Sequence, residues 1–148
     1  MQSIILGEPN AATYGEAALL GFAAGLIAGS TRARLSVATL DAWLRPPIAL
    51  GQIAMRFGER NVPLGFVTWA YVPTEDAAKL NARGGRPPDP EEWNAGTELW
   101  IVDVFAPHGG VIPLLRAVAR RHASSHSHAW IIDRRSHASK VLAIGCRD

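Results

Sequence analysis

The spacing of apolar positions divides the chain into helical and extended segments. Apolar side chains recur every three to four residues in four segments, which predicts helices over residues 11–28, 37–44, 74–82 and 109–122. Shorter runs rich in β-branched and aromatic residues predict strands over residues 50–57, 64–71, 99–105, 129–132 and 141–144.

Residues that favour helix ends and turns set the boundaries of these segments. Asn10 is a suitable cap for the first helix, and Gly29 is a suitable end. We expect Pro46-Pro47 to stop the second helix, because proline has no backbone N–H. A turn over residues 58–61 joins the first two strands into a hairpin. A hairpin followed by a strand–glycine loop–helix–strand unit predicts an α/β (α+β) fold, in which helices flank a mixed central sheet.

Composition indicates one globular domain over residues 1–148. The chain is 48% hydrophobic and 19% charged, which is enough apolar material for a core. The net charge is only +2, and no zinc-finger, RRM or helix-turn-helix pattern is present, so we expect no nucleic-acid partner. The positively charged residues near the C-terminal end of the sequence would form a local basic face that suits an acidic protein or a phosphate group. These cations are Arg116, Arg120, Arg121, Arg134, Arg135 and Lys140.

Cysteine usage and hydropathy bear on location and assembly. Cys146 is the single cysteine and cannot form an internal disulfide, which favours a reducing compartment and a cytoplasmic location. The apolar run over residues 17–29 is too short and too rich in glycine and alanine to span a membrane, so we expect no transmembrane segment. The low charge and high alanine content are compatible with a subunit interface, so a homodimer is one expectation.

The strand over residues 99–105 carries a carboxylate in unusual surroundings. Asp103 stands among tryptophan, isoleucine, valine and phenylalanine residues. Burial disfavours the charged form of such a group unless a cation or hydrogen-bond donors hold it. Asp103 is therefore a candidate for proton transfer or for orienting a catalytic partner. The alternative is a strand-end carboxylate that faces solvent or pairs with an arginine.

A glycine pair follows this strand and precedes the last predicted helix. In N-acetyltransferases that use acyl-CoA, backbone N–H groups at such a helix N-terminus bind phosphate. Gly109 and Gly110 are candidates for this role, with Arg116 as a cation further along the helix. The alternative is an ordinary tight turn. His108, just before the pair, is either a candidate acid or base or a plain loop residue.

The remaining histidines and the cysteine carry less chemistry. His122, His126 and His128 have no carboxylate or cysteine at a spacing typical of a metal site, so we predict solvated side chains and no metal. Cys146 is a poor candidate for a nucleophile, because no charged partner stands near it in the sequence.

Several motifs occur in a fixed order over nearly the whole chain. They are Pro46-Pro47-Ile48 followed by Gln52; Pro63 with Trp69-Ala70; Trp93-Asn94-Ala95-Gly96 leading into Leu99-Trp100-Ile101-Val102-Asp103; Ala106-Pro107-His108-Gly109; and Asp133 through His137 to Lys140-Val141. In these motifs the chain resembles the toxin-activating lysine acyltransferases, which acylate internal lysines of RTX protoxins. The resemblance implies a cytoplasmic enzyme with an N-acetyltransferase-like (GNAT-like) fold. It also implies a fatty acyl chain on acyl carrier protein (ACP) as donor, no tightly bound cofactor, and a lysine ε-amine of a protein or peptide as acceptor.

The resemblance also assigns site residues. The family pairs a histidine after the first helix with the aspartate of the central strand; Asp103 fills the aspartate position, and Arg32 stands where the histidine is expected. Arg32 cannot act as a general base, because a guanidinium stays protonated, but it could hold Asp103 charged or bind the donor's phosphopantetheine. The candidates for lining the acyl or acceptor site are Gln52, Trp69 and Trp100, with core packing as the alternative for the tryptophans.

Three functions stay open at this point. The first is an ACP-dependent lysine N-acyltransferase. The second is a catalytically silent binding module of the same fold, which the missing histidine suggests. The third is a small-molecule N-acetyltransferase that uses acetyl-CoA. The short glycine loop counts against the third, since that class usually carries a longer Arg/Gln-x-x-Gly-x-Gly/Ala run.

Overall fold

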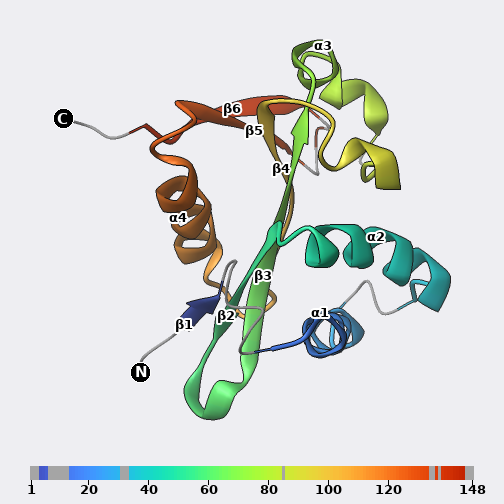
Figure 1. Cartoon of the computed structure of the whole chain (residues 1–148). Coiled ribbons are helices and arrows are strands. Elements are labelled where there is room, and N and C mark those ends of the chain that lie inside the picture. The colour runs from blue at the N-terminus through green and yellow to red at the C-terminus, as the bar shows by residue number, and fades with distance from the viewer. Residues whose placement is uncertain are drawn as a thin grey trace.

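The computed structural model describes residues 4–6 (backbone only), 14–30, 34–84, 86–133, 136 and 138–145. A six-stranded sheet runs through its centre in the order β1-β2-β3-β4-β5-β6 (Figure 1). The strands are β1 (Ile4–Leu6), β2 (Ile53–Phe57), β3 (Pro63–Val72), β4 (Glu98–Phe105), β5 (His128–Ile132) and β6 (Ser139–Ala143). Neighbouring strands are antiparallel except β4 and β5, which are parallel. The predicted mixed sheet is confirmed.

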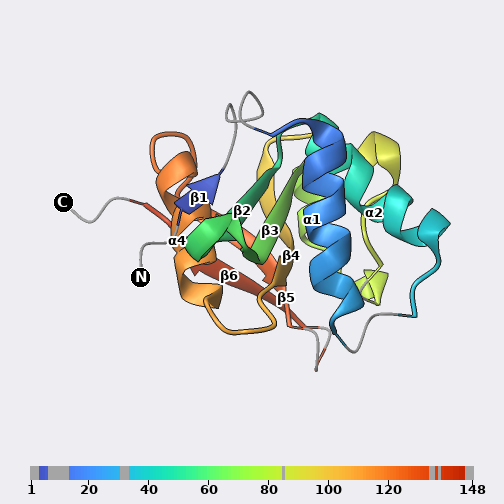
Figure 2. The same cartoon turned by 90° about the horizontal axis from the view of Figure 1, so that it is seen from below.

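Helices cover both faces of this sheet. The α-helices are α1 (Glu16–Ala28), α2 (Val37–Ala49), α3 (Thr74–Ala77) and α4 (Val111–His122). The described residues also form three short 3-10 helices, η2 (Glu59–Asn61), η3 (Leu80–Arg83) and η4 (Pro90–Glu92). Helices α1 and α2 lie on one face and α4 on the other, with the sheet between them (Figure 2). Helix α4 connects β4 to the parallel strand β5, as a crossover connection requires.

Alternation along β3 divides the core between the two faces. Val67 and Trp69 pack with Leu114 of α4. Phe66 faces the opposite side and packs with α1 and α2, while Ala70 packs with Trp93, Trp100 and η3 on that same side. Residues two apart on a strand share a face, so this division follows from the pleat.

A β-bulge interrupts the pairing of β3 with β4. Thr68 pairs with Asp103, but the next residue, Trp69, pairs with Ile101, so Val102 is the extra residue. Strand β5 pairs with β4 only at Trp100 and Ile101. The last four residues of β4 therefore have β3 as a neighbour but not β5, and the two parallel strands part just before Asp103.

The first two helices differ from their predicted bounds. Helix α1 begins at Glu16 with Gly15 as its cap; Asn10 and residues 11–13 lie outside the described part. Helix α2 does not stop at Pro46-Pro47 but continues to Ala49. Each proline removes only its own N–H, and its carbonyl still accepts: Pro46 O bonds Leu50 N–H and Pro47 O bonds Gln52 N–H.

Two further elements differ from their predicted bounds. Strand β2 begins at Ile53 rather than residue 50, because Leu50 caps α2 and Gly51 turns the chain with a φ of 68°. The helix predicted over residues 74–82 divides into α3 and η3, and its N-cap is Pro73, which has no side-chain hydrogen bond to offer.

Candidate active site

Asp103 is buried on the face that carries α1 and α2. It is 3% exposed, and its cross-strand neighbour Thr68 is 0% exposed. On one side of this pair the Phe66 and Phe105 rings stack 5.5 Å apart. The predicted burial of the carboxylate is confirmed, and the alternative of a solvent-facing strand-end aspartate is wrong.

Thr68 gives this site an available hydroxyl. Its Oγ1 is buried and has no hydrogen-bond partner among the described residues. A buried hydroxyl without a partner is rare and is stabilised as soon as a ligand or water bonds it. The place where β4 and β5 part therefore holds a carboxylate and an unused hydroxyl side by side.

The glycine loop after β4 leads to the uncapped N-terminus of α4. Gly109 and Gly110 have φ angles of 85° and 95°, which favour glycine, and Gly110 caps the helix without a side-chain bond. Val111 and Ile112 occupy the first two helical positions. Their N–H groups have no partner inside the helix, so this end can bind an anion.

Arg56 lies against this loop. A Cβ at Gly110 would collide with Arg56 Nη1, so the guanidinium is in contact with the backbone of the loop. Arg56 Nε is buried and has no hydrogen-bond partner among the described residues. The sequence did not indicate Arg56, because β2 and the loop after β4 are far apart in sequence and come together only in the folded sheet. An arginine on an otherwise apolar strand was the one available signal.

The other predicted catalytic and donor-binding residues are more exposed or lie outside the described part. His108 is exposed in the loop, and Arg116 is exposed on α4. Arg116 makes no ion pair or hydrogen bond within the residues that the structure describes, so its cation is available to a partner. Arg32, His137 and Cys146 lie outside the described residues. The roles predicted for Arg32, His108 and Arg116 stay predictions.

Gln52 has a structural role. It is 4% exposed, and its Nε2 donates two hydrogen bonds of 2.9 Å, to Trp69 O and to Trp93 O. These bonds tie β3 to the segment before β4. Both amide hydrogens are used, so a substrate contact by this group would require one of these bonds to break.

The two tryptophans predicted to line the substrate site lie on opposite faces of the sheet. Trp69 packs against α4, where Arg121 Cζ stands 5.3 Å from the centre of its ring. Trp100 packs with η3, and Arg83 Cζ stands 5.3 Å from its ring. Only Trp100 shares the face of Asp103. Core packing accounts for both residues, and their contact with substrate stays a prediction.

His122 is buried and not solvated, contrary to the sequence-based expectation. Its Nδ1 donates to Val118 O at 2.8 Å, which leaves Nε2 to accept the hydroxyl hydrogen of Tyr71 at 2.7 Å. Burial lowers the pKa of His122 below its ordinary value, and the bond to the Val118 carbonyl opposes this shift. Within the described residues, no three histidine, cysteine, aspartate or glutamate side chains form a group that could hold a metal ion.

A mixed sheet whose parallel strands part beside a buried carboxylate, next to a glycine loop and a helix N-terminus, defines an N-acetyltransferase-like domain. Residues 12–144 match the model of the RTX toxin acyltransferase family, and the chain belongs to that family. The protein is therefore an acyltransferase of the class that acts on toxins. No protein with a curated description matches the chain. In the described part of the chain, no helix has both the length and the hydropathy of a membrane span.

Proposed function

We propose that the protein transfers a fatty acyl group from ACP to the ε-amino group of a lysine in a toxin protein or peptide. One observation carries the proposal: Asp103 is buried at the bulge where β4 leaves β5. The family match over residues 12–144 supports acyl transfer to a toxin. The ACP donor, the lysine acceptor and the cytoplasmic location are part of the proposal.

The reaction needs a group that takes a proton from the amine. A lysine side chain has an ordinary pKa of about 10.4, so it reaches the site mainly as an ammonium ion. The ammonium first gives one proton to the solvent; the neutral nitrogen then attacks the thioester carbonyl, an N–C bond forms, and the C–S bond breaks. In the proposed cycle Asp103 takes the second proton, which the nitrogen releases on attack, and returns it to the leaving sulfur, so the carboxylate is regenerated. In this proposal Thr68, the cross-strand neighbour of Asp103, would hydrogen-bond a group held beside the carboxylate through Oγ1.

The loop after β4 would hold the donor. Phosphopantetheine carries a phosphodiester, and the helix N-terminus at Gly110 presents backbone N–H groups and a positive dipole end. Arg56 adds a guanidinium in contact with Gly110, and its Nε has no hydrogen-bond partner among the residues that the structure describes. Exposed cations on α4, Arg116 and Arg120, would face the carrier protein and favour an acidic surface.

A silent binding module is the second candidate, because Arg32 stands at the position of the family histidine. A guanidinium cannot serve as a general base. In the enzyme proposal Asp103 alone moves the proton, and Arg32 contributes charge. The two candidates differ in turnover and not in fold.

Intact-mass spectrometry separates the candidates. The purified chain is mixed with acyl-ACP of several chain lengths and with an RTX protoxin fragment or lysine peptide. The proposal predicts a mass gain of one acyl group on lysine. A failure to acylate any acceptor, with the carrier protein still bound, would favour the silent module. Acetyl transfer from acetyl-CoA to small amines without carrier protein would favour the third candidate.

A further inference from the structure

A cavity of about 520 Å³ opens where β4 and β5 begin. Tyr71, Glu98, His126, Ser127 and His128 are among the residues that line it. Glu98 stands five positions before Asp103 on β4, which corresponds to about 16 Å of extended strand. The cavity is therefore separate from the candidate active site.

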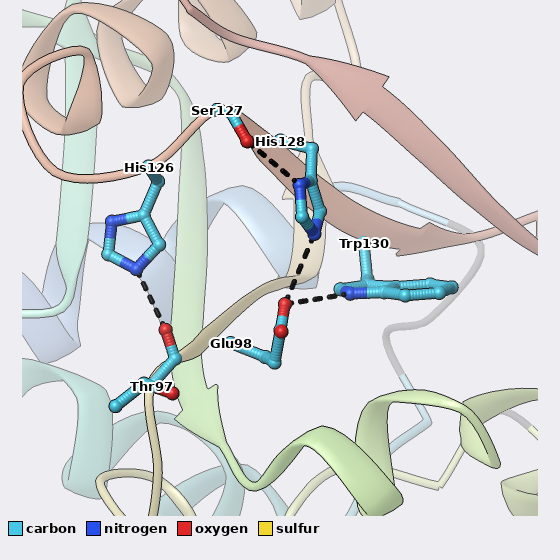
Figure 3. Close-up of polar contacts among 6 residues, drawn as sticks. All are labelled: Thr97, Glu98, His126, Ser127, His128 and Trp130. Carbon is cyan, nitrogen blue, oxygen red and sulfur yellow. Dashed lines mark hydrogen bonds and ion pairs between the residues drawn. The ribbon is translucent and has the colours of Figure 1, made fainter.

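Two N–H donors orient the carboxylate of Glu98 in this cavity (Figure 3). Oε2 lies 3.2 Å from His128 Nε2 and accepts the indole hydrogen of Trp130 Nε1, also at 3.2 Å. Ser127 Oγ stands 3.1 Å from His128 Nδ1 and can donate to it, so the imidazole hydrogen lies toward Glu98. Within the described part of the chain, Oε1 accepts no hydrogen bond. The carboxylate is thus fixed by one oxygen and available through the other.

One wall of the cavity consists of two stacked rings. The Tyr71 and His126 rings stack 5.9 Å apart, and His126 Nε2 donates to Thr97 O at 2.8 Å, which holds the wall in place. Among the described residues no lysine or arginine lines the cavity, although the chain as a whole carries a net charge of +2. Tyr71 packs on the α4 face of the sheet, whereas Glu98 bonds Trp130 on the other face, so the attraction for an alkylammonium group comes from the available carboxylate oxygen.

We propose that this cavity binds the ammonium group of a lysine side chain of the acceptor, at a position other than the lysine that is acylated. One available oxygen suits the point charge of an ammonium better than a guanidinium, which binds a carboxylate through both oxygens. Assigning the lysine to the acceptor rests on the proposed function. Recognition of the ammonium rests only on Glu98 and its surroundings.

The test uses the full chain labelled with ¹⁵N and the probe Nα-acetyl-lysine N-methylamide. The indole N–H signal of Trp130, assigned from its loss in Trp130→Phe, reports on Glu98. A saturable shift of this signal is expected with the lysine probe. The neutral norleucine analogue is expected to leave it unchanged. Equal shifts with both probes would overturn the proposal, because they would show apolar contact only.

Two matched variants locate the binding charge. Glu98→Gln keeps the shape and one acceptor oxygen but removes the charge, and it is expected to abolish saturation by the lysine probe. Glu91→Gln removes a charge from an exposed glutamate outside the cavity and is expected to bind as the wild type does. Binding that persists in Glu98→Gln contradicts the proposal. The titration needs no acyl donor, so Asp103→Asn should bind the probe even if acylation fails. Intact acylation with no probe binding would overturn this inference alone.

Discussion

Replacing Arg56 by methionine should raise stability and weaken donor binding at the same time. Methionine keeps an unbranched side chain of similar length but removes the buried Nε, which has no hydrogen-bond partner among the described residues. A buried donor without a partner costs about 1–3 kcal/mol, and the lower end applies because the rest of the side chain is only partly buried. We therefore expect a gain of about 1 kcal/mol, or about 3 °C in Tm.

The effect on activity should have the opposite sign. A hydrogen bond from a guanidinium to a phosphate contributes about 1.5–3 kcal/mol, so its loss corresponds to a rise in KM for acyl-ACP of about 10- to 100-fold. The KM for the acceptor should not change, because Arg56 contacts the loop at Gly110 on the α4 side of the sheet. Calorimetry measures Tm, and steady-state kinetics with varied acyl-ACP measures the KM for the donor.

A matched control shows whether the two effects depend on the position of Arg56 or only on the loss of one positive charge. Arg86→Met removes one positive charge from an exposed arginine and should change neither Tm nor KM appreciably. The reasoning about Arg56 fails if Arg56→Met lowers Tm, since the guanidinium would then have a partner in the protein. It also fails if the KM for acyl-ACP stays at the wild-type value.

Two further predictions concern stability. Gln52→Leu removes the donor to Trp69 O and Trp93 O and should cost about 1–3 kcal/mol, measured as a lower Tm, with turnover per folded molecule retained; an unchanged Tm would contradict it. The second prediction concerns His122, whose pKa is lower in the folded state than the ordinary value of about 6.5. Between these two pKa values the folded state binds fewer protons than the unfolded state, so the free energy of unfolding should fall as pH falls through this window. His122→Gln cannot take up the proton, and its Tm should fall less than that of the wild type between about pH 7.5 and 5.5; equal slopes would show that His122 does not titrate on unfolding.

The parts of the site within one stretch of sequence were predictable. The strand that carries Asp103, the glycine pair and α4 follow each other along the chain, and apolar periodicity and glycine placement identify all three. The burial of Asp103 followed from its apolar neighbours, because an alternating strand in a covered sheet leaves little solvent access.

The parts that depend on pairing between distant segments were not predictable. The bulge at Val102 arises from the register of β3 against β4, and no residue in either strand predicts it. The contact of Arg56 with Gly110 and the bonds of Gln52 to two carbonyls join segments far apart in sequence. The continuation of α2 through Pro46-Pro47 shows tertiary packing prevailing over local preference, since Pro47 and Ile48 are buried in the folded chain.

The turnover of Asp103→Asn tests the central claim most directly. Asparagine keeps the size and one acceptor oxygen of the side chain but does not act as a base, and Asp76→Asn at an exposed position is the matched control. Acyl transfer from acyl-ACP to the lysine acceptor, followed by intact mass, should slow by about 100-fold or more in Asp103→Asn, which is the contribution of a general base. The control should match the wild type. A variant that folds as the wild type does and acylates at the wild-type rate would contradict the account.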